Sequence, residues 1–353
     1  MPAIKPTRPV RRGCSQGFFA GRYKTTPEDF VVDELPAYEP SGQGDHAFLW
    51  IEKRGLSTID LLDELGRRLD RHPKSFGVAG LKDAQAVSRQ WVSVEHVDTR
   101  AVEALRGDRF AVLRVARHGN KLKLGHLRGN RFSITLRGTA PDDLARAQHN
   151  LAELQRVGVP NYFGEQRFGK RGANLQKGLD ILHGDPVQFA RKMPRRVFGL
   201  VLSAVQSELF NRVVMKRLQG LGTLLAGDLA FLHRNGATFP IEDPAREQPR
   251  ADSFEISPSG PMPGPKMAVP DGEPRALEVA ALEELGVDPD RFWDLPFGVA
   301  AGERRPLRIP VTECAAEAVE GGLRLQFALP RGSYATSVLR ELLTDTIWFE
   351  QRT

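Results

Sequence analysis

The chain has 353 residues, of which 41% are hydrophobic and 27% charged, and this ordinary composition excludes disordered, collagen-like and membrane-spanning classes. No run approaches the ~18 apolar residues that a membrane span needs. Only two cysteines, Cys14 and Cys314, are present, which excludes a disulfide framework or a cysteine zinc site and favours a reducing cytoplasm. The net charge of +6 favours a polyanionic partner. The basic first residues lack an apolar segment, so a frayed tail is expected there.

The first 158 residues predict a mixture of strands and helices. Alternating and β-branched residues predict four strands, at 28–35, 46–53, 76–80 and 89–96. A helix is expected over 57–70, capped by Ser57 or Thr58. Its buried stripe is expected to consist of Ile59, Leu61, Leu62 and Leu65. Acidic residues at the start and Gly158 at the end predict a second helix over 141–158.

A basic stretch between Arg109 and Pro141 contains no acidic residue. Its alternation predicts strands, including one in KLKLG (121–125), with Gly119-Asn120 as a turn. Such a one-signed ribbon repels itself unless a phosphate backbone crosses it, so we favour nucleic acid over a solvated face balanced by distant acids. The cations concerned are Arg109, Arg114, Arg117, Lys121, Lys123, Arg128, Arg131 and Arg137.

The pattern changes after residue 158. Two or three helices are expected over 158–308, one of them the apolar segment 197–218, and Asn235-Gly236 predicts a hairpin. Residues 256–275 hold six prolines and are expected to form a surface loop. A strand at 323–330 and a helix at 333–346 follow. A second basic cluster, with Phe163 and Phe168 interleaved, comprises Arg167, Lys170, Arg171, Arg191, Lys192, Arg195 and Arg196.

The loop Gly80-Leu81-Lys82-Asp83 joins two expected strands, a place where catalytic residues are common. Taken alone, the pattern is better explained as an aspartate in a turn. In its context, GLKDAQAVSRQW resembles the signature of the tRNA pseudouridine synthase D (TruD) family, G-x-K-D-x-x-A-x-[ST]-x-Q. Further matching blocks follow the family order and extend from about residue 17 to residue 345: KTTPEDFVVDE (24–34), ARHGNKLKLGHLRGNRF (116–132), GVPNYFGEQRFG (158–169) and LPRGSYATSVLREL (329–342).

The resemblance implies an α+β pseudouridine synthase fold, a mixed and largely antiparallel sheet with helices, interrupted by an inserted α+β domain. The catalytic domain would comprise residues 15–157 plus 309–353, and the inserted TRUD domain residues 158–308. The implied activity is isomerisation of uridine to pseudouridine in tRNA, at position 13, without a cofactor or metal. The expected protein is a cytoplasmic monomer with no membrane contact and no obligate protein partner.

The resemblance also implies roles for individual residues. Asp83 would be the catalytic carboxylate, attacking C1′, attacking C6 or removing a sugar proton, and the sequence leaves these routes open. Lys24, rather than Lys82, would take the place that arginine holds in other pseudouridine synthases. Departures from the family pattern at Leu81 and Ser88 are not expected to touch the chemistry. The flipped uridine would contact Phe30, Asn130, Phe132 and Tyr334.

Several alternatives stay open at this stage. Phe30 and Phe132 fit a hydrophobic core as well as a pocket on local pattern. Asn161, Tyr162, Phe163 and Gln166 open the inserted segment and are candidate RNA contacts or hinge residues. The competing functions are modification of another RNA and non-catalytic RNA binding.

Overall fold

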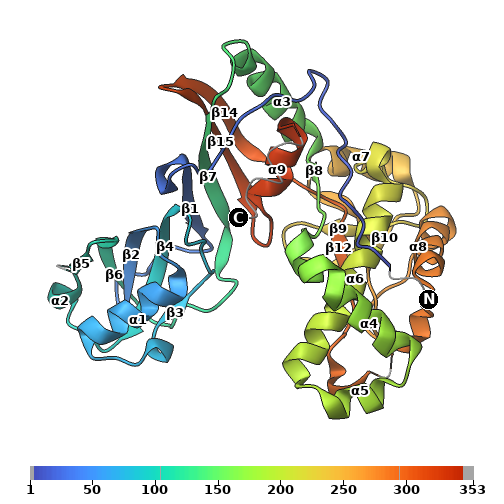
Figure 1. Ribbon diagram of the computed structural model, residues 1–353, viewed down its shortest axis with the longest axis horizontal. Helices are drawn as coiled ribbons and strands as arrows, with labels where there is room; N and C mark the ends of the chain where they lie inside the picture. The colour runs from blue at the N-terminus through green and yellow to red at the C-terminus, as the bar shows by residue number, and fades with distance from the viewer. Residues whose placement is uncertain (1–3, 104, 294, 345–353) are drawn as a thin grey trace. The chain divides into compact units, whose positions relative to one another are not determined.

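The computed structural model describes residues 4–103, 105–293 and 295–344, which form two compact units (Figure 1). The first, called the sheet unit here, contains residues 13–155 and 310–344. The second, the helical unit, contains residues 4–12 and 156–309. The expected domain division had assigned residues 4–12 to neither part.

A mixed sheet organises the sheet unit, and nine of its strands are found within the described residues. The order is β14-β15-β7-β1-β4-β2-β6-β5, with β3 paired to β4; among these described strands only β1 and β4 run parallel. The strands are β1 (Phe30–Pro36), β2 (His46–Arg54), β3 (Gly77–Val78), β4 (Val87–Glu95), β5 (Arg106–Gly107), β6 (Phe110–His118), β7 (Leu127–Arg137), β14 (Thr312–Val319) and β15 (Gly322–Pro330). The expected α+β fold with a largely antiparallel sheet is confirmed.

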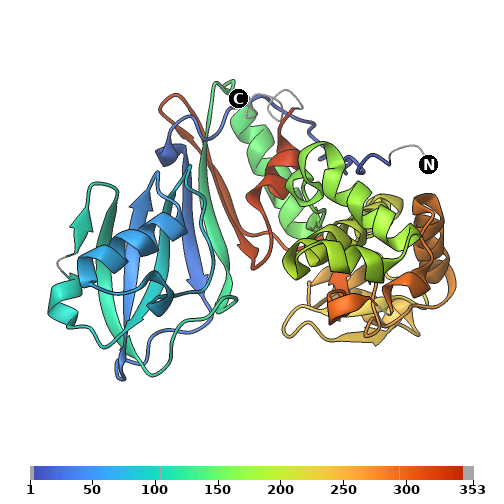
Figure 2. The ribbon, with the colours of Figure 1, turned by 60° about the horizontal axis from the view of Figure 1, so that its bottom comes forward.

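Helices cover parts of this sheet. Its helical elements are η1 (Pro27–Asp29), α1 (Thr58–Leu69), η2 (Pro73–Ser75), α2 (Thr99–Glu103), α3 (Asp143–Val157) and α9 (Ala335–Leu342). Both ribbon views place α3 and α9 beside the β7–β15 half of the sheet (Figures 1 and 2). Ser57 caps α1 as expected, its side chain accepting from the Asp60 N–H at 3.1 Å. The helix expected over 333–346 is shorter than predicted: α9 ends at Leu342, and Leu343 is extended and bridges Phe19. Residues 345–346 of the predicted range lie outside the described residues.

The predicted buried stripe of α1 is partly wrong. Leu61 and Leu65 pack into the core beneath β2, β4 and β6 and are fully buried. Ile59, in contrast, is 60% exposed, and Leu62 is half-buried. Successive helical residues are 100° apart, so a helix that buries Leu61 and Leu65 turns Ile59 away from the sheet.

The long-range pairing brings β1 to the middle of the candidate site. β1 lies between β4 and β7, and β7 in turn pairs with β15. In this register Val32 lies opposite Phe132, and Phe132 lies opposite Phe327. Three segments far apart in the sequence therefore meet side by side in one sheet (Figure 2).

The predicted basic ribbon is wrong in its layout. KLKLG (121–125) is a loop, and β6 and β7 are not neighbours: β6 pairs with β2 and β5, whereas β7 pairs with β1 and β15. The loop is anchored by Leu122, a buried residue whose N–H donates to Ser93 Oγ at 2.9 Å. Because the Ser93 side chain already accepts from this buried N–H, the segment does not need a neighbouring strand to bond it.

The helical unit contains five α-helices within the described residues, more than the two or three expected. Its sheets have the orders β10-β9-β11-β12 and β13-β8. Its elements are β8 (Val159–Pro160), η3 (Glu165–Phe168), η4 (Lys170–Gly172), α4 (Ala173–His183), α5 (Pro186–Lys192), α6 (Arg195–Lys216), η5 (Leu218–Gly220), β9 (Leu229–Leu232), β10 (Thr238–Pro240), α7 (Pro244–Asp252), β11 (Ile256–Met262), α8 (Gly272–Leu285), η6 (Pro289–Phe292), η7 (Pro296–Gly298), β12 (Glu303–Pro306) and β13 (Arg308–Ile309). Asn235-Gly236 forms the expected hairpin between β9 and β10, with Gly236 at φ 79°.

Helix α6 is the core of the helical unit. By length and composition it could cross a membrane, which corrects the expectation that no segment is apolar enough. Its side chains pack against α4, α8 and β11, and 72% of its most apolar window is buried inside the protein. It is therefore a core helix, apolar because protein surrounds it on most sides.

The expected proline-rich surface loop is also wrong in part. Residues 256–262 form β11, a strand whose residues are all buried, and α8 begins at Gly272. β11 changes partner along its length, pairing first with β9 and then with β12. Proline lacks only the donor, and its carbonyl still accepts: Pro258 O accepts from Leu307 N at 2.9 Å.

The described part of the N-terminal segment is packed rather than frayed. Ile4 contacts the core of the helical unit, and Thr7 N lies 2.9 Å from the buried carboxylate of Glu208. Thr7 Oγ1 also donates to Glu208, at 2.6 Å. A buried carboxylate needs such donors, which fixes the segment in place.

Candidate active site

Lys24 and Asp83 form an ion pair at the centre of the candidate site. Lys24 Nζ lies 2.5 Å from Asp83 Oδ2, and the side chain of Lys24 is 16% exposed whereas that of Asp83 is 49% exposed. Lys24 has φ 60°, a left-handed conformation that costs energy for a side chain with a Cβ. Asp83 is therefore paired with a cation and yet remains accessible to a ligand.

The polypeptide around Asp83 favours its ionised form. Partial burial by itself raises the pKa of Asp83, but the Lys24 hydrogen bond, the Gln85 N–H and the charges of Lys24 and Lys53 together hold that pKa below its usual value. The Gln85 N–H donates to Asp83 Oδ1 at 3.0 Å. The carboxylate is therefore charged at neutral pH, as a nucleophile or base requires.

Lys53 is a site residue that the sequence analysis missed. It is fully buried, and its Nζ donates to Leu56 O at 2.5 Å and to the backbone oxygen of Asp83 at 3.0 Å. Burial lowers the pKa of Lys53 to about 8. The sequence did indicate that Lys53 is buried, because it continues the alternating series Ala47, Leu49 and Ile51, whose side chains face the core from strand β2.

A buried ion pair lies below the Gly80–Asp83 loop. Lys82 Nζ is 3.1 Å from Glu34 Oε2, with side-chain exposures of 5% and 1%. Lys82 Nζ also donates to Asn130 Oδ1 at 2.5 Å. Burial raises the pKa of Glu34, partly offset by Lys82. Lys82 therefore orients Asn130 and does not contact Asp83 as Lys24 does. Glu34 was not predicted as a site residue, although it lies on the same buried face of β1 as Phe30 and Val32.

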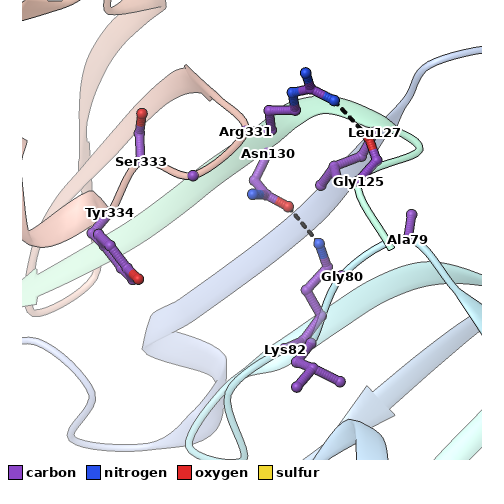
Figure 3. A pocket seen from close by; sticks show the side chains of 11 residues that line it. Ala79, Gly80, Lys82, Gly125, Leu127, Asn130, Arg331, Ser333 and Tyr334 are labelled. Carbon is purple, nitrogen blue, oxygen red and sulfur yellow. Dashed lines mark hydrogen bonds between the residues drawn. The ribbon is translucent and has the colours of Figure 1, made fainter. Parts of the chain in front are cut away.

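A pocket of about 510 Å³ opens above this ion pair, a volume typical of small-ligand sites. Asn130 extends from β7 toward Lys82, while Arg331 donates to Gly125 O at 3.0 Å (Figure 3). Tyr334 faces this region from the segment after β15 (Figure 3). Leu81, which was not expected to touch the chemistry, lines the pocket and is 64% exposed.

Tyr334 and Asn130 are thus brought together, whereas Phe30 and Phe132 lie in the core. Each of these two phenylalanines is 6% exposed, and their ring centroids are 6.1 Å apart. Phe132 also packs on Phe327, at 5.5 Å. Lys24 Nζ lies 4.6 Å from the centre of the Phe30 ring, so Phe30 supports the cation that pairs with Asp83.

Two glycines near the site differ in importance. A Cβ on Gly129 would lie 2.1 Å from Leu329 O, so only glycine lets β7 and β15 approach at this point and place Asn130. A Cβ on Gly80 would meet its nearest atom at 3.7 Å, an ordinary contact. Space is therefore left beside Gly80, whereas Gly129 is required where two strands come together.

The basic stretch is partly neutralised by acids that are distant in sequence. Arg131 lies 2.5 Å from Glu313, and Arg137 lies 2.7 Å from Asp29. Arg128 donates to the backbone oxygen of Pro36 at 3.0 Å. The solvated-face alternative thus describes Arg131 and Arg137 better than an uninterrupted phosphate track does.

The second basic cluster, in the helical unit, is mostly exposed; Phe168 is core, and half-buried Phe163 lies under Arg305 at 4.4 Å. Asn161 is buried and structural. Its Nδ2 donates to Pro306 O at 2.8 Å, and its Oδ1 accepts from Arg305 at 2.7 Å. It therefore does not serve as a surface RNA contact.

Comparison with known proteins gives consistent results across sequence and structure. The family model described as tRNA pseudouridine synthase D (TruD) matches residues 14–198 and 188–342. The chain is 42% identical over 383 residues to the tRNA pseudouridine synthase D of Geobacter metallireducens, covering 92% of this chain and 95% of that one. It is 44% identical over 327 residues to that of Anaeromyxobacter sp. (strain Fw109-5), covering 92% of each.

The fold comparison agrees. A TruD crystal structure from Methanosarcina mazei superposes with a TM-score of 0.81 over 95% of each chain, at 24% identity.

Proposed function

Because this chain belongs to the tRNA pseudouridine synthase D (TruD) family, whose members are isomerases, we propose that it converts uridine 13 of tRNA to pseudouridine through Asp83. The reaction breaks the N1–C1′ bond, rotates the uracil, and forms a C5–C1′ bond. The C5 proton is lost and N1 gains one, so atoms and charge balance without a redox partner. In this proposal the sheet unit performs catalysis, and the helical unit contributes to gripping the folded tRNA.

The observation that carries this proposal is the ion pair of Asp83 with Lys24. A carboxylate that attacks C1′ or C6, or removes a sugar proton, must be ionised while a base displaces water around it. Desolvation raises the pKa of Asp83 and so opposes ionisation, whereas the lysine at 2.5 Å lowers that pKa and offsets this effect. Each of the three routes uses the ionised carboxylate that this ion pair maintains.

The pocket supports recognition of an everted base. The Asn130 amide has a donor and an acceptor that match the polar edge of uracil, and Lys82 holds its oxygen. Lys82 uses one lone pair of Oδ1, which leaves the NH₂ as a donor and the second lone pair as an acceptor for a ligand. Tyr334 is 63% exposed and offers an aromatic surface, which we assign to the flipped uridine in preference to the mostly buried Phe132.

The choice of tRNA rests on the relatives, each named as a tRNA pseudouridine synthase, and on the chain's excess of basic residues. We assign the exposed cations of the helical unit to phosphate contacts, because they carry one sign of charge on a solvent-facing surface. We further propose that the protein acts as a monomer and without a cofactor.

The test is incubation of the purified full chain with a tRNA transcript and no additive, followed by mapping of pseudouridine at nucleotide resolution. Pseudouridine should form at position 13 and should not form in a transcript with cytidine there. Modification at another position would overturn the positional assignment, and modification only of a different RNA would overturn the substrate.

Asp83→Asn should abolish product, since an amide is neither a nucleophile nor a base here. Asp63→Asn makes the same change on an exposed residue of α1 and should leave activity intact. Retention of activity in Asp83→Asn would refute the catalytic role of Asp83.

A further inference from the structure

A second pocket of about 720 Å³ lies on the sheet unit and has no role in the mechanism above. Its lining combines aromatic, imidazole and ammonium side chains with one carboxylate. Its lining includes Tyr38, Glu39, His118, Lys121, Lys123 and His126. This mixture is suited to a ligand that has both a flat ring and a negative charge.

The centre of this pocket is a preformed aromatic platform. The Tyr38 ring stacks on His118 with centroids 5.0 Å apart and planes 25° apart, and it meets His126 edge-on at 5.7 Å. Tyr38 Oη and His126 Nδ1 are 2.9 Å apart, and His118 Nδ1 accepts from the Ser41 N–H at 3.2 Å. Although three contacts hold it, Tyr38 remains 36% exposed. An ordered, partly exposed ring loses little entropy when a base stacks on it.

One loop connects this pocket to the candidate active site. In the segment between β6 and β7, Lys121, Lys123 and His126 line the second pocket, whereas Gly125 lines the pocket beside Lys82 and Asn130. The Gly125 N–H donates to Ala79 O at 2.8 Å, which ties the loop to the strand that leads into Gly80. Gly125 and His126 are consecutive residues, so the two pockets lie on either side of this hydrogen-bonded loop.

The charges of the second pocket are arranged for a single anion. Lys123 is exposed, and its side chain makes no hydrogen bond or ion pair within the described residues. Lys121 Nζ donates to Lys74 O at 2.8 Å and adds a second positive charge. Glu39, the acid in the lining, is 3.8 Å from Arg114 and so is partly neutralised. A phosphate is favoured near the lysines and a neutral base near Tyr38.

We infer that this second pocket binds another nucleotide of the same RNA, its base stacked on Tyr38 and its phosphate near Lys123, while the uridine occupies the pocket at Asn130. The inference rests on the proposed function and extends it. Holding a neighbouring nucleotide would compensate part of the cost of flipping the target, because stacking lost in the RNA is replaced by stacking on the protein.

Tyr38→Ala in the full chain tests the platform. The dissociation constant for tRNA should rise roughly tenfold or more, whereas Tyr38→Phe, which keeps the ring, should remain near wild type. At saturating protein the single-turnover rate should change much less than the dissociation constant. Lys123→Gln should lower the slope of log K against log salt by about 1, and Arg67→Gln, an equal charge loss on exposed α1, should not.

A footprint on the unmodified protein makes the test independent of folding in Tyr38→Ala. Bound tRNA should protect His118 and His126 from acylation by diethyl pyrocarbonate more than it protects His149, an exposed residue of α3. If tRNA protected all three histidines equally, the inference would be overturned. A folded Tyr38→Ala variant with unchanged affinity for tRNA would also overturn it. Absence of pseudouridine from the wild type would instead overturn the proposed function and leave this RNA site standing.

Discussion

Lys24 Nζ lies 2.5 Å from Asp83 Oδ2 although 59 positions separate the two residues in the chain. Lys24 reaches this position from a left-handed backbone conformation, with φ 60°. Strained residues of this kind are frequent at functional sites, where the surrounding structure maintains them. The pair links the control of charge at Asp83 to the β1–β4 pairing that brings the two segments together.

Replacing Lys24 by methionine should move the acid limb of the kcat/KM profile to higher pH. The lysine contributes to the low pKa of Asp83, and burial, which raises that pKa, would no longer be opposed. The reactive carboxylate would then be protonated at a higher pH. We expect a loss of about 10- to 100-fold in kcat at neutral pH, the scale of one charged hydrogen bond.

The measurement is a pH–rate profile of wild type, Lys24→Met and Lys24→Arg. The arginine variant keeps a cation and should retain an acid limb close to that of wild type. Coincident acid limbs for wild type and Lys24→Met would show that Lys24 does not control the ionisation of Asp83.

Lys82→Met should destabilise the fold by about 3–5 kcal/mol, because it leaves Glu34 as an unpaired buried carboxylate. The double variant Lys82→Met/Glu34→Gln should recover much of that loss, since neither residue is then charged. Denaturant unfolding of both variants measures the difference. If the single variant proved as stable as the double one, Glu34 would not depend on Lys82.

Phe132 and Tyr334 should separate stability from substrate binding. Phe132→Ala removes a buried ring that packs on Phe30 and Phe327 and should cost about 3–5 kcal/mol of stability. Tyr334→Ala removes a 63% exposed ring and should leave the melting temperature nearly unchanged while raising KM for tRNA. A KM for tRNA that is the same in Tyr334→Ala as in the wild type would exclude Tyr334 from the substrate site.

Stability should depend on Lys53 at alkaline pH. Burial lowers its pKa from 10.5 to about 8, so between these values the unfolded chain binds a proton that the folded chain does not. Stability relative to Lys53→Met should therefore rise as pH increases from about 8 to 10.5, by about 3 kcal/mol in total. Denaturant titrations across this range provide the comparison, and a constant difference would contradict the assignment.

Arg128→Ala/Arg131→Ala should weaken tRNA binding and reduce its salt dependence while slowing the bound-state reaction less. Both residues lie in the acid-free stretch, but Arg131 is paired with Glu313, so its contribution should be the smaller one. Arg67→Ala/Arg100→Ala removes the same charge from α1 and α2 and serves as control. Unchanged affinity with slower turnover would show that these arginines do not contact phosphate.

Many of the residues at the candidate site could be predicted from the sequence, because they lie in short motifs that match the family pattern. The GLKD loop, the GNRF segment and the GSY segment were each identified, and the helix and strand periodicities located most elements around them. Local pattern fails where a side chain serves a long-range contact. KLKLG alternates like a strand, but a hydrogen bond to Ser93 holds it as a loop. Pro258 lies in a buried strand because its carbonyl oxygen can still accept a hydrogen bond there.

The sequence by itself determined the family, the fold class and the residue types available for chemistry. Only the tertiary structure decided which charges meet: Lys24 with Asp83, Lys82 with Glu34, and Arg131 with Glu313. The physical reason is that periodicity reports the face on which a residue lies, whereas pairing depends on strand order and register. Burial then fixes the ionisation of each partner, because desolvation acts only once the chain has brought them together.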